Sequence, residues 1–263
     1  MPPIITQIYE IQTAAEAEEI INLGVDHVGT VLVSKERWKQ SAISEVRKVV
    51  REMGAQSSII PLFSEPDSVY AVINHYEPDI IHLCEHLSTD ARRSNACDAL
   101  IQLQAGIKNR FPGVRIMRSI PIAPEGFANR VPTLELAKLF EPVSDLFLTD
   151  TLLVKNSPQP VSGFVGITGK TCDWRIASKL VEQSTIPVIL AGGLSPENVH
   201  AGVMAVKPAG VDSCTLTNTV DGNKKPVRFK KNMRSVKKFV DQTRKARQSL
   251  AAETDACDVA KVI

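Results

Sequence analysis

The chain has 263 residues, a formal net charge of +2 and 43% hydrophobic residues, enough to bury one large core. This charge balance points to no nucleic-acid or membrane partner, and the apolar runs have the length of strands rather than of membrane spans. The first residues, MPPIITQIYE, lack the basic and apolar segments of a secretory signal. The five cysteines are scattered, so we expect reduced thiols in a cytoplasmic protein.

The hydrophobic pattern alternates between strand-like and helix-like segments along the chain. Strands are expected at residues 4–11, 26–33, 57–63, 79–84, 113–120, 145–150, 186–191 and 210–215. A helical pattern follows each strand, and the last one places Phe229, Met233, Val236 and Val240 on one face. These units predict a single closed (β/α)8 barrel over residues 1–249, with an open doubly wound sheet as the competing arrangement. Residues 250–263 are expected to form a flexible C-terminal tail.

The stretch IPVILAGGLSPEN, residues 186–198, combines a buried strand, a glycine pair and a helix start. Ser195 is the expected N-cap and Pro196 the expected first helical residue. Backbone amides in such a turn, together with the positive end of a helix dipole, favour a phosphate. The strand is the seventh in order, and the loops after strands seven and eight commonly hold a phosphate in such barrels.

Polar residues at the carboxyl ends of the predicted strands mark a candidate active site, because barrel enzymes carry their chemistry there. They include Tyr9, Glu10, Arg37, His82, Cys84, Glu85, Arg118, Asp150 and Asp212. Asp150 is the strongest candidate, since a carboxylate that ends an apolar strand needs a partner or a task to offset its desolvation. Tyr9 and His82 could equally fill the barrel interior. Glu10 alternates with Tyr9 and is expected to face the helices.

Two further patterns are assigned no function. Residues 169–171, Gly-Lys-Thr, look like the end of a phosphate-binding P-loop but lack the earlier glycine of that motif. Residues 224–247 carry eleven Lys or Arg side chains. The apolar positions among them follow a helical period, which favours a solvated helix face over a nucleic-acid site.

Four segments of the second half together resemble the phosphoribosylanthranilate isomerase family. They are FLTDT (147–151), GITGKTCDW (166–174), LAGGLSPENV (190–199) and GVDSCT (210–215). TQIYEI, VGTVLVSKERW and IIHLCE in the first half agree more loosely, so that the resemblance spans residues 4–243. It implies a (β/α)8 barrel of the ribulose-phosphate-binding type that acts in tryptophan biosynthesis. It also implies a phosphorylated sugar as ligand, no metal or organic cofactor, and a monomer or homodimer.

The family's reaction is an Amadori rearrangement of an aminoaldose to an aminoketose. It needs an acid that protonates the ribose ring oxygen and a base that removes the C2 proton. By resemblance, Asp150 matches the acid, and Tyr9 stands where the family has its catalytic cysteine. Arg37 and His82 match substrate-binding positions, whereas Gly192, Gly193, Asp212 and Cys214 match phosphate-binding ones. Asp150 suits its role only if burial raises its pKa toward neutrality.

The sequence departs from the family pattern at the base. A phenol has a pKa near 10 and is a poor base at neutral pH, so Tyr9, Glu10 and Cys84 are all weighed as replacements. Glu10 also replaces a family glycine, and Leu216 replaces a glycine of the eighth loop. Two functions therefore stay open: a divergent isomerase with weak activity or an altered substrate, and a non-catalytic phosphosugar sensor or protein-interaction barrel.

Overall fold

The computed structural model describes residues 3–87, 94–154 and 158–260. Eight parallel strands pair in sequence order and close into a barrel, because β8 pairs with β1. The strands are β1 (Ile5–Ile8), β2 (His27–Leu32), β3 (Gln56–Pro61), β4 (Ile80–Leu83), β5 (Arg115–Ile122), β6 (Leu146–Thr151), β7 (Val188–Leu190) and β8 (Gly210–Ser213). The predicted (β/α)8 barrel is therefore confirmed, and the open sheet is excluded.

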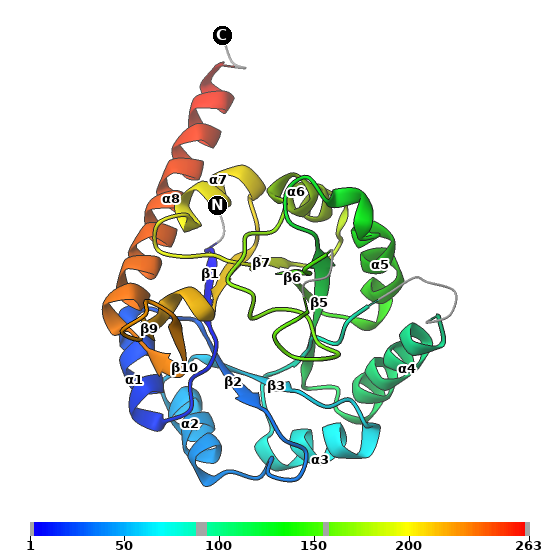
Figure 1. The fold of residues 1–263 in the computed structure, drawn as a ribbon. Helices are drawn as coiled ribbons and strands as arrows, with labels where there is room; N and C mark the ends of the chain where they lie inside the picture. Colours follow the sequence, from blue (N-terminus) through cyan, green and yellow to red (C-terminus); the bar gives the residue numbers. More distant parts are fainter. Residues whose placement is uncertain (1–2, 88–93, 155–157, 261–263) are drawn as a thin grey trace.

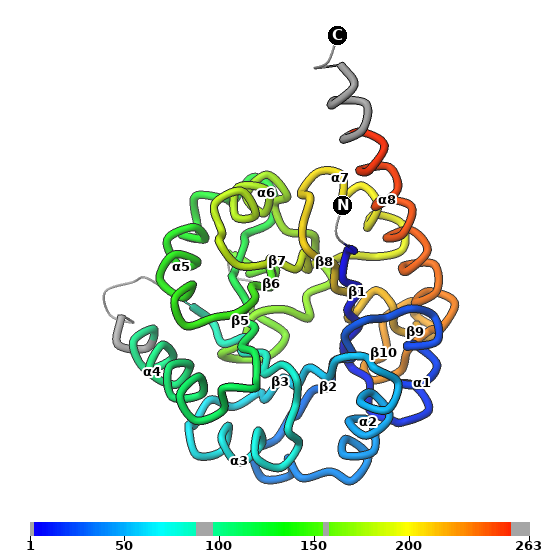
Figure 2. Tube along the Cα trace, turned by 180° about the vertical axis from the view of Figure 1, so that it is seen from behind, coloured from blue at the N-terminus to red at the C-terminus, as the bar shows by residue number. Residues whose placement is uncertain are grey.

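The helices form a ring around the strands (Figures 1 and 2). They are α1 (Ala14–Leu23), α2 (Ser41–Glu52), α3 (Pro66–Tyr76), α4 (Ser94–Arg110), α5 (Thr133–Phe140), α6 (Trp174–Gln183), α7 (Val199–Val206) and α8 (Met233–Ala260). Short 3₁₀ turns lie at Ala128–Arg130, Glu141–Val143 and Thr215–Thr217. The predicted periodicity explains how they pack: Ile43, Val46 and Val50 of α2 lie on one face and are buried.

Side chains alternate along each strand between the barrel axis and the helix layer. One buried cluster fills the barrel and contains Tyr9, Val31, Ile80, Met117, Leu146, Leu148, Ile189 and Ala191. Phe147, one position along β6, packs outward with Phe140 of α5 and Leu180 of α6. This alternation decides which residues of each strand end can reach the barrel mouth.

The structure corrects the sequence analysis in the segment after β8. Phe229 does not belong to the last helix: it lies in β10 (Pro226–Lys231), which pairs with β9 (Asn218–Val220) as an antiparallel hairpin. The hairpin turn carries Asp221 and Gly222, a turn signal that could have revealed it. The Asp221 amide donates to the Lys225 carbonyl at 2.9 Å and closes the hairpin turn.

Two helix boundaries also differ from the predictions. The chain from Ser195 to Asn198 forms a turn in which the Ser195 N–H donates to the Asn198 side chain, and α7 begins only at Val199. At the other end, α8 continues to Ala260 through residues expected to form a loose tail, and Leu250 is buried against the core. No helix in the described part of the chain is long and apolar enough to cross a membrane.

Candidate active site

Two small adjoining cavities lie at the carboxyl ends of the strands. The mouth cavity, of about 50 Å³, is lined by Tyr9, Glu10, Val31, Ile60, Leu62, His82, Cys84, Leu148, Asp150, Val161, Phe164, Val165, Gly166, Ile167, Asp212 and Cys214. The loop cavity, of about 40 Å³, is lined by Asp150, Ile167, Thr168, Gly169, Gly192, Gly193, Leu194, Asp212, Ser213, Cys214, Thr215 and Leu216. Asp150, Ile167, Asp212 and Cys214 border both and so form their junction. Seven of the eight predicted site residues thus line one or both cavities.

Asp150 lies near the end of β6 with its carboxyl at this junction. Its Oδ1 accepts a hydrogen bond of 2.8 Å from the Thr151 amide. The backbone of Gly166 presses against the other oxygen so closely that a Cβ at position 166 would lie 2.2 Å from Oδ2. Burial raises the pKa of Asp150 to about 7, partly opposed by the Thr151 hydrogen bond. The carboxyl therefore has the acidity that proton donation at neutral pH requires.

Asp212 points from β8 toward the barrel axis and is only 7% exposed. In the register of the barrel it lies beside Gln7 of β1, whose Nε2 donates to Asp212 Oδ1 at 3.1 Å. The Gln7 oxygen is held in turn by His27 Nδ1 at 3.1 Å. Burial raises the pKa of Asp212 to about 7, and the charge of Asp150 adds to the shift. The Asp212 side chain thus contacts the barrel interior and also lines the loop cavity beside the eighth loop.

Tyr9 fills the space beside β2, where Gly29 makes room for it. A Cβ at position 29 would lie 2.1 Å from the Tyr9 ring. The Tyr9 hydroxyl lies 2.6 Å from Ser58 Oγ and 2.7 Å from His82 Nδ1, and His82 Nε2 lies 2.8 Å from Ser119 Oγ. Burial raises the pKa of Tyr9 well above its usual value and lowers that of His82 to about 3. Both groups are therefore neutral near pH 7, and they share a hydrogen bond.

Glu10 does not face the helices, contrary to the prediction from alternation. It adopts a left-handed backbone with φ of 66°, a conformation that costs a side-chain residue about 1–2 kcal/mol. Its carboxylate accepts hydrogen bonds from Arg228 Nε at 2.6 Å, Asn218 Nδ2 at 2.8 Å and the Phe229 amide at 3.2 Å. Burial would raise the pKa of Glu10, but these bonds outweigh it and lower the pKa. Glu10 therefore anchors the β9–β10 hairpin.

The glycine pair after β7 forms the tight turn predicted for it. Gly192 and Gly193 have φ of 85° and 64°. A Cβ at Gly193 would lie 2.4 Å from the Lys170 carbonyl carbon, so the turn and the loop after β6 touch backbone to backbone. Across the loop cavity, Lys231 Nζ donates to the Cys214 carbonyl at 2.7 Å and fixes the eighth loop. Small residues and fixed backbone are the features of an anion site.

Residues 158–173, which precede α6, cross the barrel mouth (Figure 1). The Val165 amide donates to the Cys84 carbonyl, and the His86 amide donates to the Gly163 carbonyl, both at 2.8 Å. Phe164 and Val165 therefore sit over the mouth cavity from the side of β4. Thr151 Oγ1 donates to the Lys170 carbonyl at 2.6 Å and holds the far end of the same segment.

Of three further residues predicted at the strand ends, two lie outside both cavities and the third lines the mouth cavity as a protonated thiol. Arg37 is exposed in the second loop and lies outside the lining of both cavities. Arg118 is fully buried behind β5, where it pairs with Glu85 at 2.6 Å and lies over the ring of Phe140. Cys84 lines the mouth, but burial raises the pKa of its thiol well above the usual value.

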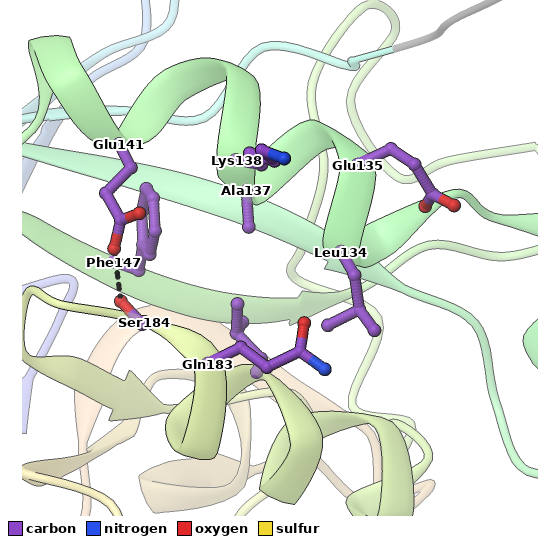
Figure 3. A pocket seen from close by; sticks show the side chains of 9 residues that line it. Leu134, Glu135, Ala137, Lys138, Glu141, Phe147, Gln183 and Ser184 are labelled. Carbon is purple, nitrogen blue, oxygen red and sulfur yellow. Dashed lines mark hydrogen bonds between the residues drawn. The ribbon is translucent and has the colours of Figure 1, made fainter.

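A larger surface groove, of about 320 Å³, lies outside the barrel between α5 and α6 (Figure 3). It is lined by Leu134, Glu135, Ala137, Lys138, Glu141, Phe147, Leu180, Gln183 and Ser184, and Glu141 is tied there to Ser184. None of the predicted site residues lines it. Among residues 3–87, 94–154 and 158–260, no three or more His, Cys, Asp or Glu side chains are grouped as a metal ion would require.

The fold agrees with comparisons to known proteins. Residues 114–242 match the family model described as N-(5'-phosphoribosyl)anthranilate (PRA) isomerase. A relative named N-(5'-phosphoribosyl)anthranilate isomerase 2, from Methanosarcina mazei, is 30% identical over 202 residues, covering 76% of this chain and 80% of that protein. The chain belongs to the phosphoribosylanthranilate isomerase family.

Two further matches extend the comparison. A phosphoribosylanthranilate isomerase from Methanocella arvoryzae is 35% identical over 138 residues, which are 52% of this chain and only 54% of that relative. A solved phosphoribosyl anthranilate isomerase in complex with reduced 1-(o-carboxyphenylamino)-1-deoxyribulose 5-phosphate has a TM-score of 0.62 at 19% identity. The alignment covers 92% of this chain and 98% of that one, which shows a shared fold.

Within this family barrel, sequence reasoning missed the interior partners of the site. Gln7, Ser58 and Ser119 are ordinary polar residues in strands, and only the barrel register brings them against Asp212, Tyr9 and His82. Strand alternation offers a partial signal, because all three occupy inward positions.

Proposed function

We propose that this chain is an isomerase that converts N-(5'-phosphoribosyl)anthranilate, or a close analogue of it, into the corresponding 1-amino-1-deoxyketose phosphate. The observation that carries the proposal is the Asp150 carboxyl, whose pKa lies near 7 at the junction of the two cavities. A protonated Asp150 can deliver its proton to the ribose ring oxygen, so that the C1–O bond breaks and the amine nitrogen forms an iminium at C1.

The phosphate of this substrate is assigned to the loop cavity. The Gly192–Gly193 turn, the loop after β6 and the eighth loop surround that cavity, and the glycine turn approaches the loop after β6 more closely than a side chain at Gly193 would allow. Two carboxyls at the inner edge disfavour an anion there and so support a phosphate position at the outer, glycine-lined end. The sugar then extends inward past Asp150.

The phosphate assignment predicts that Gly193→Val weakens ligand binding by at least about tenfold, because a Cβ at this position collides with Lys170 and β-branched residues disfavour positive φ. The Kd of the reduced product analogue, measured by calorimetry, is the readout. Gly113→Val is the matched control, since a Cβ at Gly113 meets nothing within 4 Å. Equal Kd values for the two variants would place the phosphate elsewhere.

Turnover by the purified full chain tests the function itself. Loss of the substrate's fluorescence, followed with product identification by mass spectrometry, is expected for the unmodified protein. Binding of the product analogue without any turnover would instead support the phosphosugar-sensor alternative. We further propose a monomer or homodimer that acts in the cytoplasm without a metal, an organic cofactor or a nucleic acid. Light scattering tests the oligomeric state. Activity that persists in the presence of a chelator tests the independence from a metal.

A further inference from the structure

The rearrangement needs a second proton-transfer group besides Asp150, and the cavities limit where it can lie. With the phosphate at the glycine turn, the five-carbon sugar passes through the junction, and the amine substituent occupies the mouth cavity. The ring oxygen and C2 therefore lie at the junction. Of the residues that border it, Asp150, Asp212 and Cys214 carry groups that can exchange a proton. Burial raises the pKa of the Cys214 thiol, which disfavours the thiolate that a base would need and leaves the two carboxyls.

The three bases weighed from the sequence are unavailable in the structure. The Tyr9 hydroxyl is engaged by Ser58 and His82, and its ring lies in the space left by Gly29. The Glu10 carboxylate is saturated by donors of the β9–β10 hairpin, with Arg228 closest at 2.6 Å. Cys84 borders the mouth but not the junction.

We propose that Asp212 is the catalytic base that removes the C2 proton, an inference that rests on the isomerase function proposed above. The carboxyl borders both cavities and is 7% exposed, and among the residues that the structure describes its side-chain hydrogen bond is made on one oxygen, with Gln7. His27 holds that Gln7 side chain in turn, so the orientation of the carboxyl is set by residues of the barrel strands β1 and β2. The other oxygen is free to meet the sugar.

The step balances within the substrate and the two carboxyls. After Asp150 has given its proton to the ring oxygen, the C2–H electron pair moves to form a C1=C2 double bond. The C1=N bond becomes single as its electrons return to nitrogen, and the proton passes to Asp212. The resulting enaminol then becomes the ketone: the C2 hydroxyl loses its proton and C1 gains one, so that no oxidant or other reactant is needed.

The proximity of two carboxyls at one enclosed junction also explains why one acts as the acid and the other as the base. Like charges in a shared low-dielectric space do not ionise together, so one carboxyl keeps a proton while the other is charged. The Gln7 amide donates to Asp212 and favours its charged form. Asp150 also accepts one hydrogen bond, from the Thr151 amide, but at Asp212 the positive charge of Lys231 adds to the Gln7 bond in favouring the charged form. The proton is therefore placed on Asp150 and the charge on Asp212.

The experiment compares Asp212→Asn, Asp212→Glu and Tyr9→Phe with the unmodified full chain, with Asp67→Asn on the exposed start of α3 as the matched control. Asp212→Asn should lower kcat about 10²–10⁴-fold. It should change the Kd of the reduced product analogue by less than about threefold, because the amide keeps the shape and one hydrogen bond. Asp212→Glu should recover part of kcat, and Asp67→Asn should leave both quantities unchanged.

Each result supports or overturns the role of Asp212 as the base. If the unmodified chain is active and Asp212→Asn keeps kcat within tenfold, Asp212 is not the base although the proposed function stands. If Asp212→Asn loses analogue binding as much as kcat/KM, the residue binds the sugar and the inference is overturned. If Tyr9→Phe loses as much kcat as Asp212→Asn, the phenol takes the proton instead. If the unmodified chain shows no turnover, the proposed function fails and this inference fails with it.

Discussion

Arg118→Ala should lower the free energy of unfolding by about 3–5 kcal/mol, because it strips a buried carboxylate of its counter-ion. The Arg118 side chain is completely buried between β5 and the helices. Its Nη1 donates to Glu85 at 2.6 Å, and its Nε donates to Gln104 at 2.7 Å. Urea unfolding at pH 7, followed by circular dichroism, measures the loss.

Two controls separate the buried charge from lost packing. The double variant Glu85→Met with Arg118→Met removes both charges and keeps most of the volume, so it should cost less than Arg118→Ala alone. Lys35→Ala removes an exposed ion pair with Glu65 and should leave the free energy of unfolding nearly unchanged. If Arg118→Ala and Lys35→Ala cost the same, the Arg118–Glu85 pair contributes nothing to the fold.

Asp150→Asn should reduce kcat by about 10²–10⁴-fold, because an amide cannot protonate the ribose ring oxygen. The pKa of Asp150 lies at about 7, and the active form is the protonated one. The rate constant of the unmodified protein should therefore fall as pH rises above that value, approaching a tenfold loss per pH unit. Steady-state kinetics from pH 6 to about pH 9 would record this alkaline limb.

Comparing Asp150→Asn with a control variant shows whether the alkaline limb arises from the Asp150 carboxyl. Asp150→Asn should retain its melting temperature and analogue affinity, and its residual activity should lose the alkaline limb. Asp67→Asn should keep the full profile, since its carboxyl is exposed and lies outside the lining of both cavities. An alkaline limb that persists unchanged in Asp150→Asn would assign it to another group, and undiminished kcat would remove Asp150 from the chemistry.

Much of the architecture could be predicted because the governing signals are local. Each barrel strand is short, apolar and followed by an amphipathic helix, so periodicity alone locates it. The glycine turn after β7 and the carboxylate that follows the apolar part of β6 carry their signal in neighbouring residues. The expected raised pKa of Asp150 follows from the same placement, since any carboxyl enclosed at that edge loses solvation.

The remaining features depend on contacts between distant segments. Alternation places Glu10 toward the helices, but its positive φ breaks the alternation, and the compensating bonds come from residues more than 200 positions away. The β9–β10 hairpin lies in a basic stretch whose apolar spacing also fits a helix. Arg118 follows a strand-end pattern, yet the parity of its position in β5 turns it outward. Only the register of the closed barrel resolves these cases.

The contact between Tyr9 and Gly29 constrains the order in which this lineage could change. A ring at position 9 and a Cβ at position 29 claim the same volume, with 2.1 Å between them. A tyrosine can therefore arise at position 9 only in an ancestor that already has glycine at 29, whereas a small residue at 9 leaves position 29 free to vary. Descendants that keep the tyrosine must keep the glycine, and position 29 can vary again only after position 9 has returned to a small residue.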